Sequence, residues 1–220
     1  IASFGIGIDI PKTLAFAKAQ VAAMKAAPYQ CPMLADLNEA VGQAEQGLNA
    51  PIPPFVNGIQ GINVVLLEGD FAGGQPKGLK GYAVLAAKDP KGLLAAAKAM
   101  SPQFPLNMSD DGTPMALPLP PPAQAIVGAV HLAMKGSAIV AAIGEGEQKN
   151  IAGYLALKAE APHPIAAVSY DVKKITEAAG NQMGSDEKKI VEAIGGMFGT
   201  AAMKLSFTEK GVVLSQRTQF

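Results

Sequence analysis

The stretch that decides the fold reads Lys80-Gly81-Tyr82-Ala83-Val84-Leu85-Ala86-Ala87-Lys88-Asp89-Pro90-Lys91-Gly92-Leu93. The stretch Gly73-Gly74-Gln75-Pro76-Lys77-Gly78 just before it predicts a flexible hairpin connection, and the apolar run after Lys80-Gly81 predicts a buried strand. Asp89 and Pro90 then predict a helix start, because Asp caps free backbone N–H groups and the first helical position tolerates proline. We therefore expect the return strand of a hairpin that leads directly into a helix.

Two other junctions repeat this order of strand, Asp and helix. They are Ile8-Asp9-Ile10-Pro11-Lys12-Thr13-Leu14 and Ser169-Tyr170-Asp171-Val172-Lys173-Lys174-Ile175. The turns Lys135-Gly136 and Lys210-Gly211 repeat the start of the return strand. Two explanations remain open: an internal duplication of a strand–helix–hairpin unit, or common turn chemistry that arose separately at each site. On either explanation, Asp9, Asp89 and Asp171 are predicted helix caps.

The rest of the chain alternates between strand-type and helix-type segments. Ala-rich stretches without breakers predict helices over 12–27, 33–48, 91–100, 146–158 and from 171 onward, restarting at 185. Short apolar runs beside turn residues predict strands over 3–9, 62–68, 79–88, 126–134, 137–143, 165–170, 202–208 and 212–218. The fold class that follows is α+β, with a mostly antiparallel sheet and Ala-rich helices packed on one face.

The 220 residues are enough for one large domain. Ser101–Pro122 contains seven prolines, which predict an irregular connection without a helix or a central strand. We therefore expect a single α+β domain over 1–220, composed of related halves 1–112 and 123–220 joined by this Pro-rich loop 101–122.

The composition disfavours several classes of function. Positive and negative charges balance at 18 each, so no basic field is available to attract nucleic acid. Arg217 is the single arginine, which disfavours phosphate-rich ligands, since bidentate phosphate recognition prefers Arg. The chain is 49% hydrophobic, yet none of its apolar runs reaches the roughly 18 residues of a membrane span.

Cys31 is the single cysteine, so an internal disulfide is impossible. A lone cysteine is most often buried packing, but the rigid loop Pro28-Tyr29-Gln30-Cys31-Pro32 leaves open a partner elsewhere, which would imply an oxidising compartment. The chain starts Ile1-Ala2-Ser3 without an initiator Met or a signal-like segment, and we expect a processed or excised segment of a longer protein.

Candidate chemical groups are few. His131 and His163 lie far from Cys31 and from each other in the sequence, which is no zinc pattern. Ser109-Asp110-Asp111-Gly112 is typical of a solvated turn, because it lacks the later bidentate Glu of a calcium loop. Gly144-Glu145-Gly146-Glu147 suits a helix start. We therefore expect no catalytic, cofactor-binding or metal-binding residues and no cofactor.

Two resemblances bear on function. Gly5-Ile6-Gly7-Ile8-Asp9-Ile10 resembles the opening strand of holo-acyl-carrier-protein synthases, whose Asp binds magnesium, but the Lys-Glu pair of that family has no counterpart here. The strand–Asp–helix junctions and Lys-Gly hairpins resemble uncharacterised bacterial envelope proteins, secreted or lipid-anchored, which bring no catalytic residues to transfer. That resemblance implies an extracytoplasmic location, periplasmic, secreted or lipid-anchored.

The expected function is a non-catalytic extracytoplasmic binding or structural module, with a protein or an apolar small molecule as partner, and not an enzyme. One alternative is a carrier of an apolar ligand or lipid in a cleft between sheet and helices. A second alternative is an enzyme with an unfamiliar site.

Overall fold

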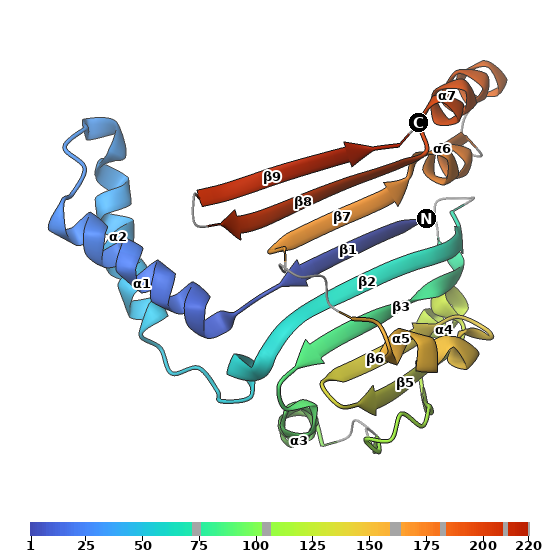
Figure 1. Cartoon of the computed structure of the whole chain (residues 1–220), viewed down its shortest axis with the longest axis horizontal. Coiled ribbons are helices and arrows are strands. Elements are labelled where there is room, and N and C mark those ends of the chain that lie inside the picture. The colour runs from blue at the N-terminus through green and yellow to red at the C-terminus, as the bar shows by residue number, and fades with distance from the viewer. Residues whose placement is uncertain (72–75, 103–106, 159–163, 181–183, 209–210, 220) are drawn as a thin grey trace.

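The computed structural model describes residues 1–71, 76–102, 107–158, 164–180, 184–208 and 211–219. Its described strands form one antiparallel sheet in the order β4-β5-β6-β3-β2-β1-β7-β8-β9 (Figure 1). The strands are β1 (Ala2–Gly7), β2 (Ile59–Asp70), β3 (Lys77–Ala87), β4 (Met115–Leu117), β5 (Val130–Lys135), β6 (Ala138–Ile143), β7 (Ala166–Asp171), β8 (Thr200–Thr208) and β9 (Gly211–Thr218). The predicted fold class, α+β with a mostly antiparallel sheet, is confirmed.

The described helices lie between these strands. They are α1 (Ile10–Ala26), α2 (Ala35–Leu48), α3 (Pro90–Met100), α4 (Pro121–Val127), α5 (Ile151–Leu155), α6 (Val172–Gly180) and α7 (Ser185–Met197). Short 3₁₀ turns, η1 (Pro32–Leu34), η2 (Val56–Gly58) and η4 (Glu147–Asn150), precede α2, β2 and α5. None of the described helices combines the length and the apolar character that crossing a bilayer requires.

The sheet repeats one topology on either side of its centre. From β1 outward the chain runs through β2 to β3, and from β7 outward it runs through β8 to β9. Each first strand is followed by two helices, α1 with α2 and α6 with α7. β1 and β7 pair antiparallel, with Gly5 opposite Ala167, so the two groups have the same strand order outward from this central pair. Beyond β3 the sheet continues through β6, β5 and β4, whereas β9 is its other edge.

The most tightly packed part of the core lies under α5. Ile151 is 1% exposed and packs against Ala133, Val140 and Ala142 of β5 and β6. Small side chains on the strands bring the helix backbone close to the sheet, so a single large residue fills the space between them.

The α1–α2 pair departs from the expected packing of helices on the sheet. The two helices pack against each other and project beyond the ends of the strands (Figure 1). Lys25 binds Glu45 across the pair at 2.7 Å, and the Asn38 side chain bonds both the N–H and the C=O of Tyr29 in the connecting loop. No residue of α1 is buried. Its alanines offer little apolar area to hold it on a sheet.

The Pro-rich segment is also more ordered than expected. The prediction that prolines exclude a helix there is wrong, because α4 begins at Pro121. Pro120, Pro121 and Pro122 occupy its N-cap and first positions, where no backbone N–H needs an intrahelical partner. β4 lies in the same segment at the edge of the sheet, which is where strands tolerate flanking proline.

Candidate functional site

One face of the sheet carries a row of apolar side chains across its central strands. Phe4 of β1 lies opposite Val64 of β2 and Val168 of β7, and Val168 lies opposite Met203 of β8. The next row pairs Ile6 with Ile62, and on the far side Leu205 pairs with Leu214 of β9. Residues paired across strands share a face, so these rows form one continuous surface.

This surface is open to solvent. Phe4 is 44% exposed and Leu214 is 63% exposed. The residues paired with them across the strands are uncharged, so the surface around them is apolar as well as exposed. We call the large apolar side chains that are exposed in these rows the open face. They are Phe4, Ile62, Val64, Val168, Met203, Val212 and Leu214.

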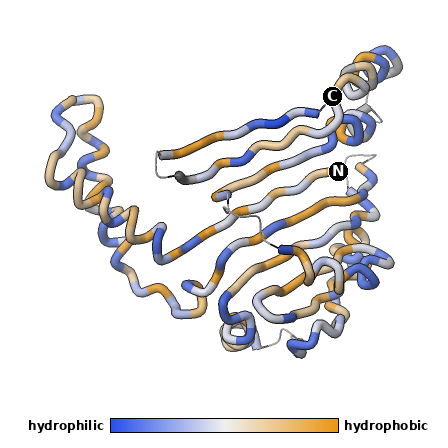
Figure 2. Tube along the Cα trace, viewed as in Figure 1, coloured by the Kyte–Doolittle hydropathy of each residue, from blue (hydrophilic) through white to orange (hydrophobic). Residues whose placement is uncertain are grey.

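The sequence builds the open face by alternation. In β1, the side chains of Phe4 and Ile6 point to one side and that of Ser3 to the other, where the next two positions are glycines, Gly5 and Gly7. The start of β9 is apolar at three consecutive residues, Val212, Val213 and Leu214, so it departs from this alternation (Figure 2). The apolar face of these strands could form part of a core, but α1 and α2 do not pack on it.

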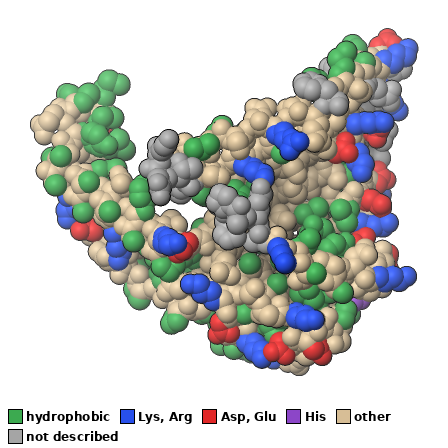
Figure 3. Space-filling view, in the orientation of Figure 1, with side chains coloured by type: hydrophobic (Ala, Val, Ile, Leu, Met, Phe, Trp, Pro, Cys, Tyr) green, Lys and Arg blue, Asp and Glu red, His purple; other side chains and the backbone are tan. Residues whose placement is uncertain are grey.

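The opposite face carries more polar side chains over the same strands. Ser3 and Ser169 share a hydrogen bond at 2.7 Å across β1 and β7. Figure 3 views the side on which α5 lies, where isolated cations stand on a surface with few apolar side chains over the upper strands. The two faces of one sheet therefore differ sharply in chemistry.

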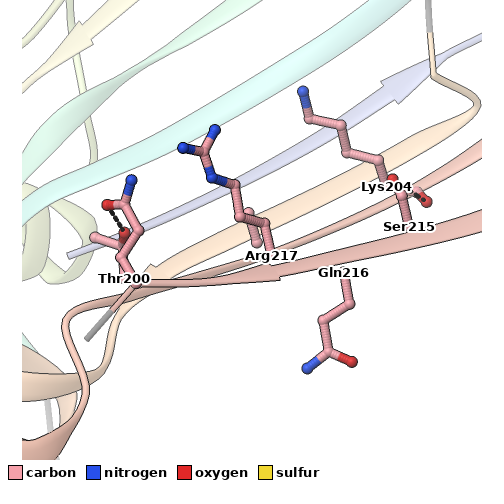
Figure 4. Close-up of a pocket in the computed structure, with 7 residues that line it drawn as sticks. Thr200, Lys204, Ser215, Gln216 and Arg217 are labelled. Carbon is pink, nitrogen blue, oxygen red and sulfur yellow. Dashed lines mark hydrogen bonds between the residues drawn. The ribbon is translucent and has the colours of Figure 1, made fainter.

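A shallow depression of about 460 Å³ lies on the polar face over β8 and β9. Lys204 and Arg217 project over it from the same side, while Gln216 points to the other face (Figure 4). Thr200 donates a hydrogen bond to Gln219 at 2.8 Å at one end. The hollow is open and carries two cations, so its chemistry suits neither an apolar ligand nor a buried catalytic group.

Two tyrosines stack beside α5 on this polar face. The rings of Tyr82 and Tyr154 lie 4.0 Å apart with an interplanar angle of 19°. Tyr154 donates its hydroxyl hydrogen to Glu147 at 2.5 Å. Burial, reinforced by this carboxylate, raises the pKa of Tyr154 to about 12, and burial also raises the pKa of Tyr82. A phenol with so high a pKa keeps its proton at neutral pH and serves here as a hydrogen-bond donor.

The three predicted caps form the same hydrogen bond. Asp9, Asp89 and Asp171 each accept from the backbone N–H three residues later, at 3.1, 2.9 and 3.0 Å. At Asp89 the partner is Gly92, where an added Cβ would collide with the carboxylate. These distances are the ones a helix cap requires, and the cap bonds keep each carboxylate at its helix start.

The other candidate residues do not converge. His131 lies on β5, and its Nδ1 is buried without a hydrogen-bond partner among the described residues. His163 lies outside the described residues, as does the Gly73-Gly74 part of the predicted hairpin connection 73–78. Within the described ranges, no group of three His, Cys, Asp or Glu side chains could hold a metal ion.

Cys31 contradicts the expectation of buried packing. It is exposed, in the loop between α1 and α2, where it precedes η1. The exposure follows from the projection of the helix pair away from the sheet, which leaves this loop without a packing surface.

The acidic turn at 109–112 holds its charges with local partners. Asp111 accepts from Ser109 Oγ at 2.6 Å and from the Thr113 N–H at 2.8 Å, and Asp110 pairs with Lys91. These bonds support the predicted solvated turn.

No family model, curated protein or solved structure matches the chain. The open face is therefore interpreted from its own geometry. The open face was not predicted from the sequence, because strand alternation identifies the apolar side of a strand but does not say whether a helix covers that side.

Proposed function

We propose that the chain is a non-catalytic binding module that docks an apolar, uncharged surface of a partner protein on its open face. The observation that carries the proposal is the run of seven large exposed apolar side chains over five adjacent strands. The largest contiguous apolar patch on a soluble protein is often an interaction site.

The size and shape of the open face favour a protein over a small ligand. The exposed parts of its seven side chains amount to on the order of 500 Å², a large share of the roughly 800 Å² that one partner contributes to a standard interface. Small apolar ligands instead occupy concave sites that bury most of their surface. Two hollows, one over the polar residues of β8 and β9 and one beside the N-terminus, are lined by none of these seven side chains.

The proposal of a non-catalytic role rests on how the reactive groups are used. Asp9, Asp89 and Asp171 cap helices, and Tyr154 binds Glu147. The extracytoplasmic location belongs to the same proposal, and it rests on the resemblance to envelope proteins alone.

Paired threonine substitutions test the docking surface. Val64→Thr with Val168→Thr places two hydroxyls in the middle of the open face while keeping β-branched side chains that suit strands. Val213→Thr is the matched control, because Val213 is 45% exposed on the other face of β9. In pull-downs from the source cells, a protein retained by the wild type and by the control but lost from the double variant is the expected result.

Native mass spectrometry of the purified chain completes the test. A retained lipid or other apolar small molecule, displaced in the double variant, would contradict protein docking and favour the carrier function. In the pull-downs, identical sets of proteins captured by the wild type, the control and the double variant would also contradict the proposal.

A further inference from the structure

The two edges of the sheet differ in how they are protected. The β4 edge has three residues, Met115–Leu117, and Pro114 and Pro118 lie on either side of it. The β9 edge has eight residues without proline, and Arg217 is its single charge. Long, apolar and uncharged edge strands are templates for pairing with another strand, and natural proteins usually protect them.

The backbone of β9 presents alternate residues to the free edge. Gln219 donates its N–H to the Thr200 C=O at 2.8 Å, which directs the backbone groups of odd-numbered residues toward β8. The N–H and C=O groups of Val212, Leu214 and Gln216 therefore point away from β8. Among the described elements, β8 is the one that packs along β9.

The topological repeat shows what fits this edge. β9 occupies the position that β3 holds on the other side of the β1–β7 centre. The outer edge of β3 is covered by an antiparallel strand, β6, over Gly81 to Ala86. At β9 none of the described strands pairs with the corresponding edge.

We propose that β9 pairs antiparallel with β9 of a second copy of this chain, about a two-fold axis at Leu214. This arrangement exchanges about six backbone hydrogen bonds, between the two Leu214 residues and between Val212 of each copy and Gln216 of the other. Arg217 then lies opposite Gly211, so no like charges face each other. The axis joins two identical edges, which makes the contact isologous and closed at the dimer.

The contact uses the edge and leaves the open face uncovered, so it stands or fails independently of the proposed docking function. It extends the sheet across the axis, because Val212 and Leu214 of the two copies lie on the same face. The open faces of two chains become one surface.

A charge-pair exchange tests the contact. We expect the wild type at about 100 μM to have twice the chain mass of 22.5 kDa by light scattering and native mass spectrometry. V212K with Q216K places like charges opposite each other at both ends of the pairing, and V212E with Q216E does the same, so each variant alone should be monomeric. An equimolar mixture of the two should recover a heterodimer, which an unfolded variant could not form.

A cysteine scan fixes the register. In a Cys31→Ser background, L214C lies opposite itself across the axis and should form a disulfide dimer under mild oxidation, whereas V213C, opposite Ser215, should not. A wild type that stays monomeric at this concentration, a dimer that survives V212K with Q216K, or equal cross-linking of L214C and V213C would overturn the proposal.

Discussion

Asp111 shows how local donors determine the state of a single side chain. Its carboxylate is fully exposed, yet the Ser109 hydroxyl and then the Thr113 N–H lower its pKa from the usual 3.8 to about 2. These donors stabilise the charged form, so the turn is folded around an ionised Asp111. The same residue type at position 110 has a lowered pKa for another reason, the neighbouring Lys91 ammonium group.

We predict that Ser109→Ala raises the pKa of Asp111 from about 2 toward 3.8, because it removes the donor with the largest effect. Because folding lowers this pKa, Asp111 contributes stability above about pH 4, and that contribution is lost as the pH falls toward 2. An NMR titration of the Asp111 side-chain carboxyl carbon measures the shift. An unchanged titration midpoint in the variant would show that Ser109 does not set the pKa.

At the scale of the element, identical caps support helices that differ in how they are packed. Asp89 begins α3, whose Pro90 is buried, whereas Asp9 begins α1, which has no buried residue. The cap bond has nearly the same length in both. Its effect on the stability of the whole protein therefore depends on whether the helix unfolds together with the sheet.

We predict that Asp89→Ala lowers the free energy of global unfolding by about 1 kcal/mol. Asp9→Ala should change it less, because α1 can open while the sheet stays folded, and should instead speed amide hydrogen exchange within α1. Urea unfolding and native-state hydrogen exchange on both variants provide the comparison. Equal losses of global stability would mean that α1 is coupled to the sheet.

The whole molecule consists of a packed sheet and a projecting helix pair. The buried apolar residues lie mainly on β3, β5, β6, β8 and α5, and the α1–α2 pair contributes Val41. Ile8 donates its N–H to the Gln60 C=O at 2.9 Å, so the chain enters and leaves the pair at neighbouring points of the sheet. The helix pair is therefore an insertion between two paired strands.

We predict that replacing residues 10–55 by a Gly-Ser linker of about four residues leaves the sheet folded. The cost in free energy of unfolding should be smaller than that of Ile151→Ala, which removes a side chain that is 1% exposed and should cost about 2–5 kcal/mol. Near-UV circular dichroism and urea unfolding of the two variants make the comparison. The deletion would contradict this division of the molecule if it proved the more destabilising change.

The sequence by itself determined the local features of the protein. The three Asp caps, the Lys135-Gly136 turn and the strand alternation depend on bonds and side-chain directions within a few residues, and such features can be recognised from residue types. Lys80-Gly81 instead lies within β3, where Gly81 pairs with Leu66. The fold class followed from these local features. The helix α4 was missed because the prolines of the segment were interpreted as breakers, although three of them occupy positions where a helix start accepts proline.

Only the tertiary structure decided which apolar surfaces are covered. The alternation of β1 identifies Phe4 and Ile6 as one side of a strand, but whether a helix lies over them depends on elements far away in the chain. α5 covers its part of the sheet because Ile151 fits against small side chains, while the Ala-rich α1 and α2 pack on each other. The open face, the exposed Cys31 and the uncovered edge of β9 arise in this way, because burial is a sum over long-range contacts that no local pattern specifies.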